Sequence, residues 1–159
     1  MTDTIAIVLA AGQGTRMKSA RPKVLHEIAG RALVEWSVGS AFEGGIDRAV
    51  VVVGHGSDAV KATLSARFAA RVDFATQEAQ RGTGDAVRSA FRALEGFEGT
   101  VVVLYGDCPL VTPETVRALV DARASKGVPL AMLTMTLVDP TGYGRILRDG
   151  EGNVTAIRE

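Results

Sequence analysis

A glycine-rich segment follows the first apolar run of the chain and is itself followed by two cations. The segment is Ala10-Ala-Gly-Gln-Gly-Thr-Arg-Met17, and Lys23 comes shortly after Arg16. Glycine backbone N–H groups bind phosphate oxygens because no Cβ blocks their approach. The dinucleotide fingerprint and the Walker pattern both fail, since position 17 is not glycine and no Gly-Lys-Ser/Thr follows. The pattern predicts a polyphosphate cradle, and the alternative is a structural strand-to-helix turn with two solvated cations.

A second polar cluster lies between two expected elements. It reads Gln77-Glu-Ala-Gln80-Arg-Gly82-Thr83-Gly-Asp85. A glutamine amide offers a donor and an acceptor together, as the edge of a nucleobase requires. Gly82 and Thr83 at a helix start can approach a ligand closely. The cluster therefore indicates a base-binding site, whereas the alternative makes Thr83 a helix N-cap and leaves the glutamines as surface polar residues.

Asp107 directly follows the fourth apolar run, in Tyr105-Gly106-Asp107-Cys108-Pro109. A carboxylate at the carboxyl end of a buried strand is costly to bury without compensation and is well placed for a divalent cation. Mg²⁺ takes one or two protein carboxylates plus phosphate oxygens and water, so a lone Asp suffices. We predict Asp107 as the Mg²⁺ ligand; the alternative is a loop Asp bonded to its own backbone. Cys108, with no nearby His, is more typical of a packed thiol than of a nucleophile.

Alternating strand and helix patterns must position these residues. Continuous β-branched runs typical of strands covered on both faces occupy residues 5–9, 49–53, 72–75 and 101–104. Helical spacing of apolar residues occupies 33–42, 58–68 and 85–94. The order predicts an α/β, doubly wound, mostly parallel sheet in three layers, Rossmann-like, with ligands beyond the carboxyl ends of the strands.

The last third of the chain carries three further expected elements. A helix should begin at Pro113, with Thr112 as N-cap, and end near Gly127. Residues 130–137 have the pattern of another strand, and residues 144–157 that of a hairpin turning at Asp149-Gly150.

Composition bounds the class of protein. The chain has 159 residues, 47% of them hydrophobic, and 18 Lys+Arg against 18 Asp+Glu give 18 − 18 = 0 formal charge. That length and content suit one domain with its own core. Without a basic run, a nucleic-acid or anionic-membrane surface is not expected, so the partners should be small molecules. The lone Cys and the absence of a signal-peptide pattern predict a cytoplasmic protein.

Four ordered motifs together resemble the sugar-phosphate nucleotidyltransferases. They are the glycine-rich segment with Pro22-Lys23, the Gln77–Asp85 cluster, the Gly106-Asp107 turn, and Gly142-Tyr-Gly144-Arg-Ile146. Within that superfamily, the chain is most similar to the N-terminal uridylyltransferase domain of the bifunctional N-acetylglucosamine-1-phosphate uridylyltransferases/glucosamine-1-phosphate acetyltransferases. The resemblance implies transfer of UMP from UTP to N-acetylglucosamine-1-phosphate, which gives pyrophosphate and UDP-N-acetylglucosamine, a peptidoglycan precursor.

The resemblance also implies a role for each matching residue. It makes Arg16, Lys23 and Asp107 the catalytic candidates, with Arg16 and Lys23 on the triphosphate and Asp107 on Mg²⁺. The implied substrate-binding residues are Leu9, Ala10, Ala11 and Gly12 along the nucleotide, Gln77, Gln80, Gly82 and Thr83 on the uracil, Gly144 and Glu159 on the amino sugar, and also Tyr105 and Gly106. An in-line attack on phosphorus needs charge neutralisation and alignment, which cations and a metal supply without a covalent nucleophile.

The same resemblance implies that residues 1–159 are one nucleotidyltransferase domain truncated at its C-terminal side, and such a domain alone is expected to be weak or inactive as an enzyme. The family's domain continues with an Asn that joins the Asp on the metal, and a left-handed β-helix acetyltransferase domain follows that would make the full-length protein a homotrimer. Three alternatives stay open: a cytidylyl- or guanylyltransferase of the related molybdopterin or isoprenoid branches, a non-catalytic nucleotide-binding module, and an α/β structural domain without a ligand.

Overall fold

The four β-branched runs form one parallel sheet. The structure is a computed structural model that describes residues 3–158 apart from 13, 15–16 and 55–56. The strands are β1 (Thr4–Leu9), β4 (Arg48–Val53), β5 (Val72–Thr76) and β6 (Thr100–Tyr105), and their order in the four-stranded sheet is β5-β4-β1-β6. The predicted α/β fold with a parallel sheet is confirmed.

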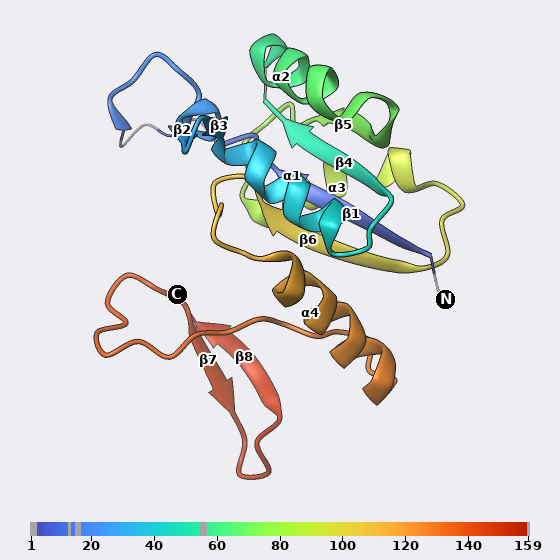
Figure 1. Ribbon diagram of the computed structural model, residues 1–159. Helices are drawn as coiled ribbons and strands as arrows, with labels where there is room; N and C mark the ends of the chain where they lie inside the picture. The colour runs from blue at the N-terminus through green and yellow to red at the C-terminus, as the bar shows by residue number, and fades with distance from the viewer. Residues whose placement is uncertain (1–2, 13, 15–16, 55–56, 159) are drawn as a thin grey trace.

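Helices cover both faces of this sheet. Helices α1 (Leu33–Glu43), α2 (Asp58–Phe68) and α4 (Pro113–Lys126) share a core with one face, through side chains such as Val34, Leu64 and Val116. Helix α3 (Thr83–Ser89) packs Ala86 against the other face, followed by the short 3₁₀ turn η4 (Phe91–Leu94). The result is the predicted three layers (Figure 1). In the part of the chain that the structure describes, no helix is long and apolar enough to cross a membrane.

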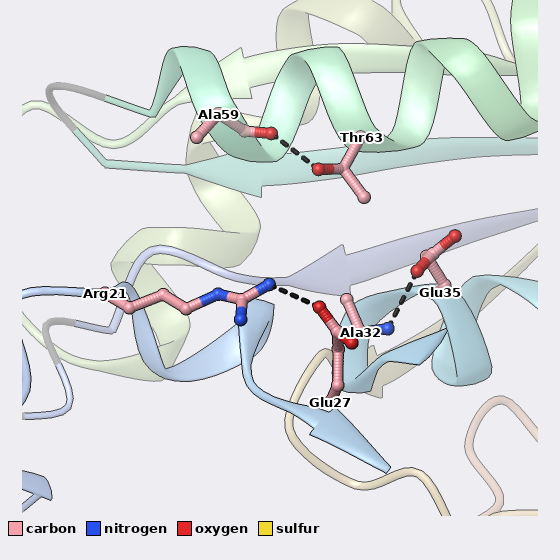
Figure 2. Close-up of polar contacts among 6 residues, drawn as sticks. All are labelled: Arg21, Glu27, Ala32, Glu35, Ala59 and Thr63. Carbon is pink, nitrogen blue, oxygen red and sulfur yellow. Dashed lines mark hydrogen bonds and ion pairs between the residues drawn. The ribbon is translucent and has the colours of Figure 1, made fainter. Parts of the chain in front are cut away.

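A small unit that the sequence pattern does not reveal lies between β1 and α1. It consists of the 3₁₀ turn η2 (Lys23–Leu25) and the antiparallel pair β2 (Glu27–Ile28) and β3 (Arg31–Ala32). Arg21 Nη2 donates to Glu27 Oε1 at 2.7 Å, and the Ala32 backbone N–H donates to Glu35 Oε2 at 2.7 Å (Figure 2). Figure 2 also draws the bond from Thr63 Oγ1 to the Ala59 carbonyl inside α2. The bond from the Leu33 backbone N–H to the His26 carbonyl, at 2.9 Å, ties the end of η2 to the start of α1.

Two sequence predictions need correction. Residues 130–137 do not form a strand; the segment 129–133 faces β6 across an apolar hollow of about 580 Å³ and pairs with no strand of the described chain. A strand needs a neighbour for its backbone hydrogen bonds, which an apolar pattern alone does not provide. The helix expected over 85–94 begins earlier and is split, because the chain tightens into bonds from Ala90 N to Val87 O and from Ala93 N to Ala90 O, both 3.0 Å.

The last two predicted elements are present. Thr112 caps α4 by accepting from the Thr115 backbone N–H at 3.3 Å, and Gly127 ends the helix in the left-handed conformation. Strands β7 (Arg145–Arg148) and β8 (Val154–Arg158) form the expected hairpin. Its turn occupies residues 149–153 and is held by Asp149, whose Oδ1 accepts from the Asn153 backbone N–H at 2.9 Å.

Candidate functional site

A cleft opens at the carboxyl ends of the parallel strands. The chain runs outward from β1 to β4 and β5 and then returns to place β6 on the other side of β1, so the order of the strands reverses between β1 and β6. Ligands of open α/β sheets bind at such a switch point. The cleft there has a volume of about 340 Å³ and is lined by Leu9, Ala11, Gly12, Lys23, Val24, Gln77, Gln80, Gly82, Thr83, Ala86, Tyr105 and Asp107. A neighbouring hollow of about 380 Å³ shares Ala11, Gly12, Gln77 and Gln80 and adds Ala10.

Backbone hydrogen bonds hold the rim of the cleft beyond the strand ends. Ala10 N donates to Val52 O and Gln77 N donates to Val53 O, both at 2.8 Å. Gly106 N donates to Leu9 O at 2.9 Å. A Cβ at position 106 would lie 3.0 Å from that same oxygen, so glycine permits this close approach between the two loops. The three loops that carry the predicted residues are thereby held in one place.

Lys23 and Asp107 meet in the cleft, although 84 residues separate them in the sequence. Lys23 Nζ lies 2.6 Å from Asp107 Oδ2, and their side chains are 40% and 30% exposed. Gly14 packs against the Lys23 stem: its φ is +61°, and a Cβ there would lie 2.6 Å from Lys23 Cβ. The glycine-rich segment and the cation predicted to act with it are therefore in direct contact.

The donor set at Asp107 suits a cation that carries ligands of its own. Over the described residues, no three His, Cys, Asp or Glu side chains gather to make a complete metal cage. Asp107 offers Oδ2 beside Lys23 and Oδ1 at 3.8 Å from Cys108 Sγ. One carboxylate, with phosphate oxygens and water completing the shell, is the arrangement that Mg²⁺ commonly adopts. The residues present fit such an ion.

Two glutamines form the opposite side of the cleft. Gln77 is only 5% exposed, and its Nε2 donates to the Gly82 carbonyl at 3.3 Å and to Asp85 Oδ2 at 3.0 Å. Gln80 Nε2 donates to the Ala11 carbonyl at 2.6 Å and so links this side to the glycine-rich segment. Gln77 is therefore buried, whereas Gln80 is exposed although its amide is bonded to the glycine-rich segment. The sequence analysis assigned no role to Asp85. Its place in the same motif as the two glutamines could have indicated that its carboxylate bonds to one of their amides.

The N-cap interpretation of Thr83 is wrong. Gly82 occupies the N-cap position of α3 and makes no side-chain cap bond, while Thr83 is the first residue of the helix and is exposed. Gly82 has φ +98°, a conformation that an L side chain adopts only with strain. Thr83 is thus left at the cleft edge, where a ligand can reach it.

The remaining predicted residues lie elsewhere. Arg16 and Glu159 fall outside the described residues. Gly144 precedes β7 and lines a separate hollow with Arg145 and Arg158. Cys108 is exposed and not packed as expected; desolvation, together with the charge of Asp107, raises the pKa of its thiol. A thiol with a raised pKa is a poor nucleophile at neutral pH.

Comparison with known proteins places the chain in a family. The family model of the MobA-like NTP transferase domain matches residues 6–148. The chain belongs to this family. It is also 52% identical over 162 residues to bifunctional protein GlmU of Sorangium cellulosum, which covers 99% of the chain and 34% of that relative. Its identity to bifunctional protein GlmU of Corynebacterium diphtheriae is 54% over 157 residues, covering 96% of the chain and 32% of the relative.

These matches confirm the resemblance that the four motifs indicated, and the chain spans about a third of the length of these relatives. Among solved structures, Rv0371c from Mycobacterium tuberculosis superposes with a TM-score of 0.66 at 25% identity, over 78% of this chain and 62% of that one. A second structure of Rv0371c is a complex with manganese, with a TM-score of 0.62. HddC from Yersinia pseudotuberculosis, complexed with GMP-PN, has a TM-score of 0.69 at 21% identity over 100% of this chain and 69% of that one, which shows the shared fold alone.

Proposed function

We propose that this NTP transferase transfers UMP from UTP to N-acetylglucosamine-1-phosphate, forming UDP-N-acetylglucosamine and pyrophosphate. One observation carries the proposal: a single cleft brings the Lys23–Asp107 pair and the two glutamines together at the switch point. The chain around this cleft is about half identical to proteins named bifunctional protein GlmU. Charged groups on one side and amides on the other suit the triphosphate and the base of one nucleotide.

The reaction requires alignment and neutralisation of charge. A phosphate oxygen of the sugar phosphate attacks the α-phosphorus of UTP, and the bond from that phosphorus to the bridging oxygen breaks. Pyrophosphate leaves with the bonding electron pair. Lys23 neutralises charge on the triphosphate, and Arg16 is the second cation proposed for that role. Residues 9–12 and Tyr105-Gly106 line the nucleotide, while Gly144 and Glu159 are the proposed contacts for the amino sugar.

Asp107 is the residue that would hold a divalent cation in this cleft. A relative of the same fold, Rv0371c, has been crystallised with manganese, and we propose Mg²⁺ for this chain. When bound, such an ion would supply positive charge that neutralises the phosphates, and Asp107 is the residue that would hold it. The part of Asp107 is to keep a carboxylate oxygen at the floor of the cleft, beside the cation of Lys23.

Nucleotide binding tests the proposal first. A ligand that binds only the folded state stabilises it by about 2.7 kcal/mol at a hundredfold excess over Kd. For a chain of this size that corresponds to a rise in Tm of about 5–10 °C. We expect UTP with Mg²⁺ to give this rise and CTP and GTP to give less. A larger shift with CTP or GTP would instead assign the chain to another nucleotidyltransferase branch.

Pyrophosphate release then separates an enzyme from a binding module. UTP, Mg²⁺ and N-acetylglucosamine-1-phosphate are supplied to the protein, and pyrophosphate is measured with a coupled assay. Release that depends on the sugar phosphate supports the transferase. Stabilisation by UTP without any release shows that residues 1–159 bind the nucleotide without transferring it, and stabilisation by no nucleotide indicates a structural domain.

A further inference from the structure

The amide of Gln77 is held by two groups that can only accept hydrogen bonds. Its Nε2 donates to the Gly82 carbonyl at 3.3 Å and to a carboxylate oxygen of Asp85 at 3.0 Å. The residue is 5% exposed, so water competes little for these bonds. A backbone carbonyl and a carboxylate have no proton to give. The amino group of the amide must therefore face them.

This arrangement leaves one orientation for the carbonyl end of Gln77. Rotating the amide by half a turn would bring Oε1 against two acceptors and would leave Nε2 without either partner, which is costly for a buried group. No described residue donates to Oε1 in the present orientation. Gln77 is one of the residues that line the cleft, and the atom of its amide that no described residue engages is an acceptor.

We propose that Asp85 is a positioning residue that makes Gln77 present a carbonyl oxygen to the nucleobase, so that the cleft selects uracil over cytosine. This inference rests on the proposed function and names the residue behind its base specificity. Uracil carries a proton on N3 and can donate to that oxygen. Cytosine has a lone pair on N3, so in the same position its N3 and the Gln77 carbonyl oxygen would be two acceptors facing each other. A site that pairs a substrate N–H rejects analogues that lack it.

The position of Asp85 suits this role. Gly82, with φ +98°, turns the chain so that its carbonyl and the side chain of Asp85, in the first turn of α3, both reach the same amide nitrogen. Ser89 Oγ donates to the Asp85 carbonyl at 3.0 Å. The second glutamine of the cleft, Gln80, is oriented separately, by the Ala11 carbonyl.

The decisive variant is Asp85→Asn. It keeps the size of the side chain but supplies an amide that can donate, so that Gln77 is free to reverse and offer Nε2 to the base. Kd is measured by calorimetry for UTP and for CTP, each with Mg²⁺. We expect the preference for UTP over CTP to fall at least about tenfold, with weaker UTP binding and tighter CTP binding. Asp85→Glu retains an acceptor and should keep most of the preference.

Asp58→Asn is the matched control. Asp58 also lies in the first turn of a helix, α2, but outside the cleft, so this variant should leave both Kd values unchanged. A purely structural role for Asp85 would weaken UTP and CTP equally, and that outcome overturns the inference. So does an unchanged preference in Asp85→Asn. If the wild-type protein binds neither nucleotide, the proposed function fails together with the inference; if it prefers UTP and the variant does too, only the role of Asp85 fails.

Discussion

Asp107→Asn separates the function of the Lys23–Asp107 pair from its contribution to stability. The variant keeps the shape of the side chain and removes its charge. The two side chains are 40% and 30% exposed, so water screens the pair and its 2.6 Å contact stabilises the fold only modestly. Pairs of this exposure contribute about 0.2–1 kcal/mol. In a chain of this length, Tm should fall by no more than about 4 °C.

The effect on nucleotide binding should be much larger than the effect on the fold. In the proposed function the charge of Asp107 holds a divalent cation against the triphosphate, and the neutral Asn side chain would not. We expect the part of the UTP-induced rise in Tm that depends on Mg²⁺ to disappear. Where pyrophosphate release is measurable, it should fall by about 10²–10³, the usual loss for one such electrostatic contact. The assay is thermal unfolding with UTP, with and without Mg²⁺.

Asp73→Asn is the control for this experiment. Asp73 pairs with Arg48 at 2.7 Å across β4 and β5, and these side chains are 49% and 59% exposed. The same substitution there removes an ion pair outside the cleft and should change neither UTP binding nor its Mg²⁺ dependence. A fall in Tm beyond about 10 °C in Asp107→Asn would mean that the pair is mainly structural. An intact Mg²⁺ effect in that variant would refute the metal role.

Two further perturbations test the loop geometry and the hairpin. Gly14→Ala forces an L residue into φ +61°, at about 1–2 kcal/mol, and places its Cβ 2.6 Å from Lys23 Cβ. Gly14→Ala should lower both the stability measured by urea titration and the affinity for UTP. Gly30→Ala is the control: it has φ +75° and no atom within 4 Å of the added Cβ, so it should lower stability alone. Hydrogen bonds from the Asn153 side chain and backbone lower the pKa of Asp149 below its ordinary 3.8. The folded pKa is thus the lower one, so the stabilisation is complete above pH 3.8 and is lost as pH falls through the lowered value. Amide NMR signals of residues 149–153 should report loosening there, and loosening that begins well above pH 3.8 would contradict this assignment.

The sequence pattern predicts the sheet well because a strand buried on both faces consists almost entirely of apolar residues. Residues 49–53 of β4 are all fully buried, and such a continuous apolar run is typical of a strand covered on both faces. Residues 130–137 carry a similar pattern but form no strand. The difference lies in the neighbouring strand: residues 129–133 line the same hollow as β6 but do not pair with it. The apolar pattern of a segment indicates which residues are buried. It does not indicate whether a neighbouring strand is available for pairing.

Strand ends also locate the candidate site before the structure is known. Asp107, Gln77 and the glycine-rich segment all follow β-strands, and parallel strands place their carboxyl ends at one edge. The position of Lys23 depends instead on η2 and on the ion pair of Arg21 with Glu27, which no strand or helix pattern reveals. Its contact with Asp107 could therefore not be predicted from spacing.

Two carboxylates, one lining the cleft and one behind it, show what spacing leaves undetermined. Asp107 follows Gly106 just after the end of β6, and Asp85 follows Gly84 in the first turn of α3. Asp107 faces the Lys23 ammonium, and a carboxylate that pairs with one cation can hold another. Asp85 faces the amide nitrogen of a buried glutamine, so its charge orients a neutral group instead. The chemistry of each carboxylate follows from its partner. That is why Asp107→Asn should affect dependence on Mg²⁺, while Asp85→Asn should affect the choice of base.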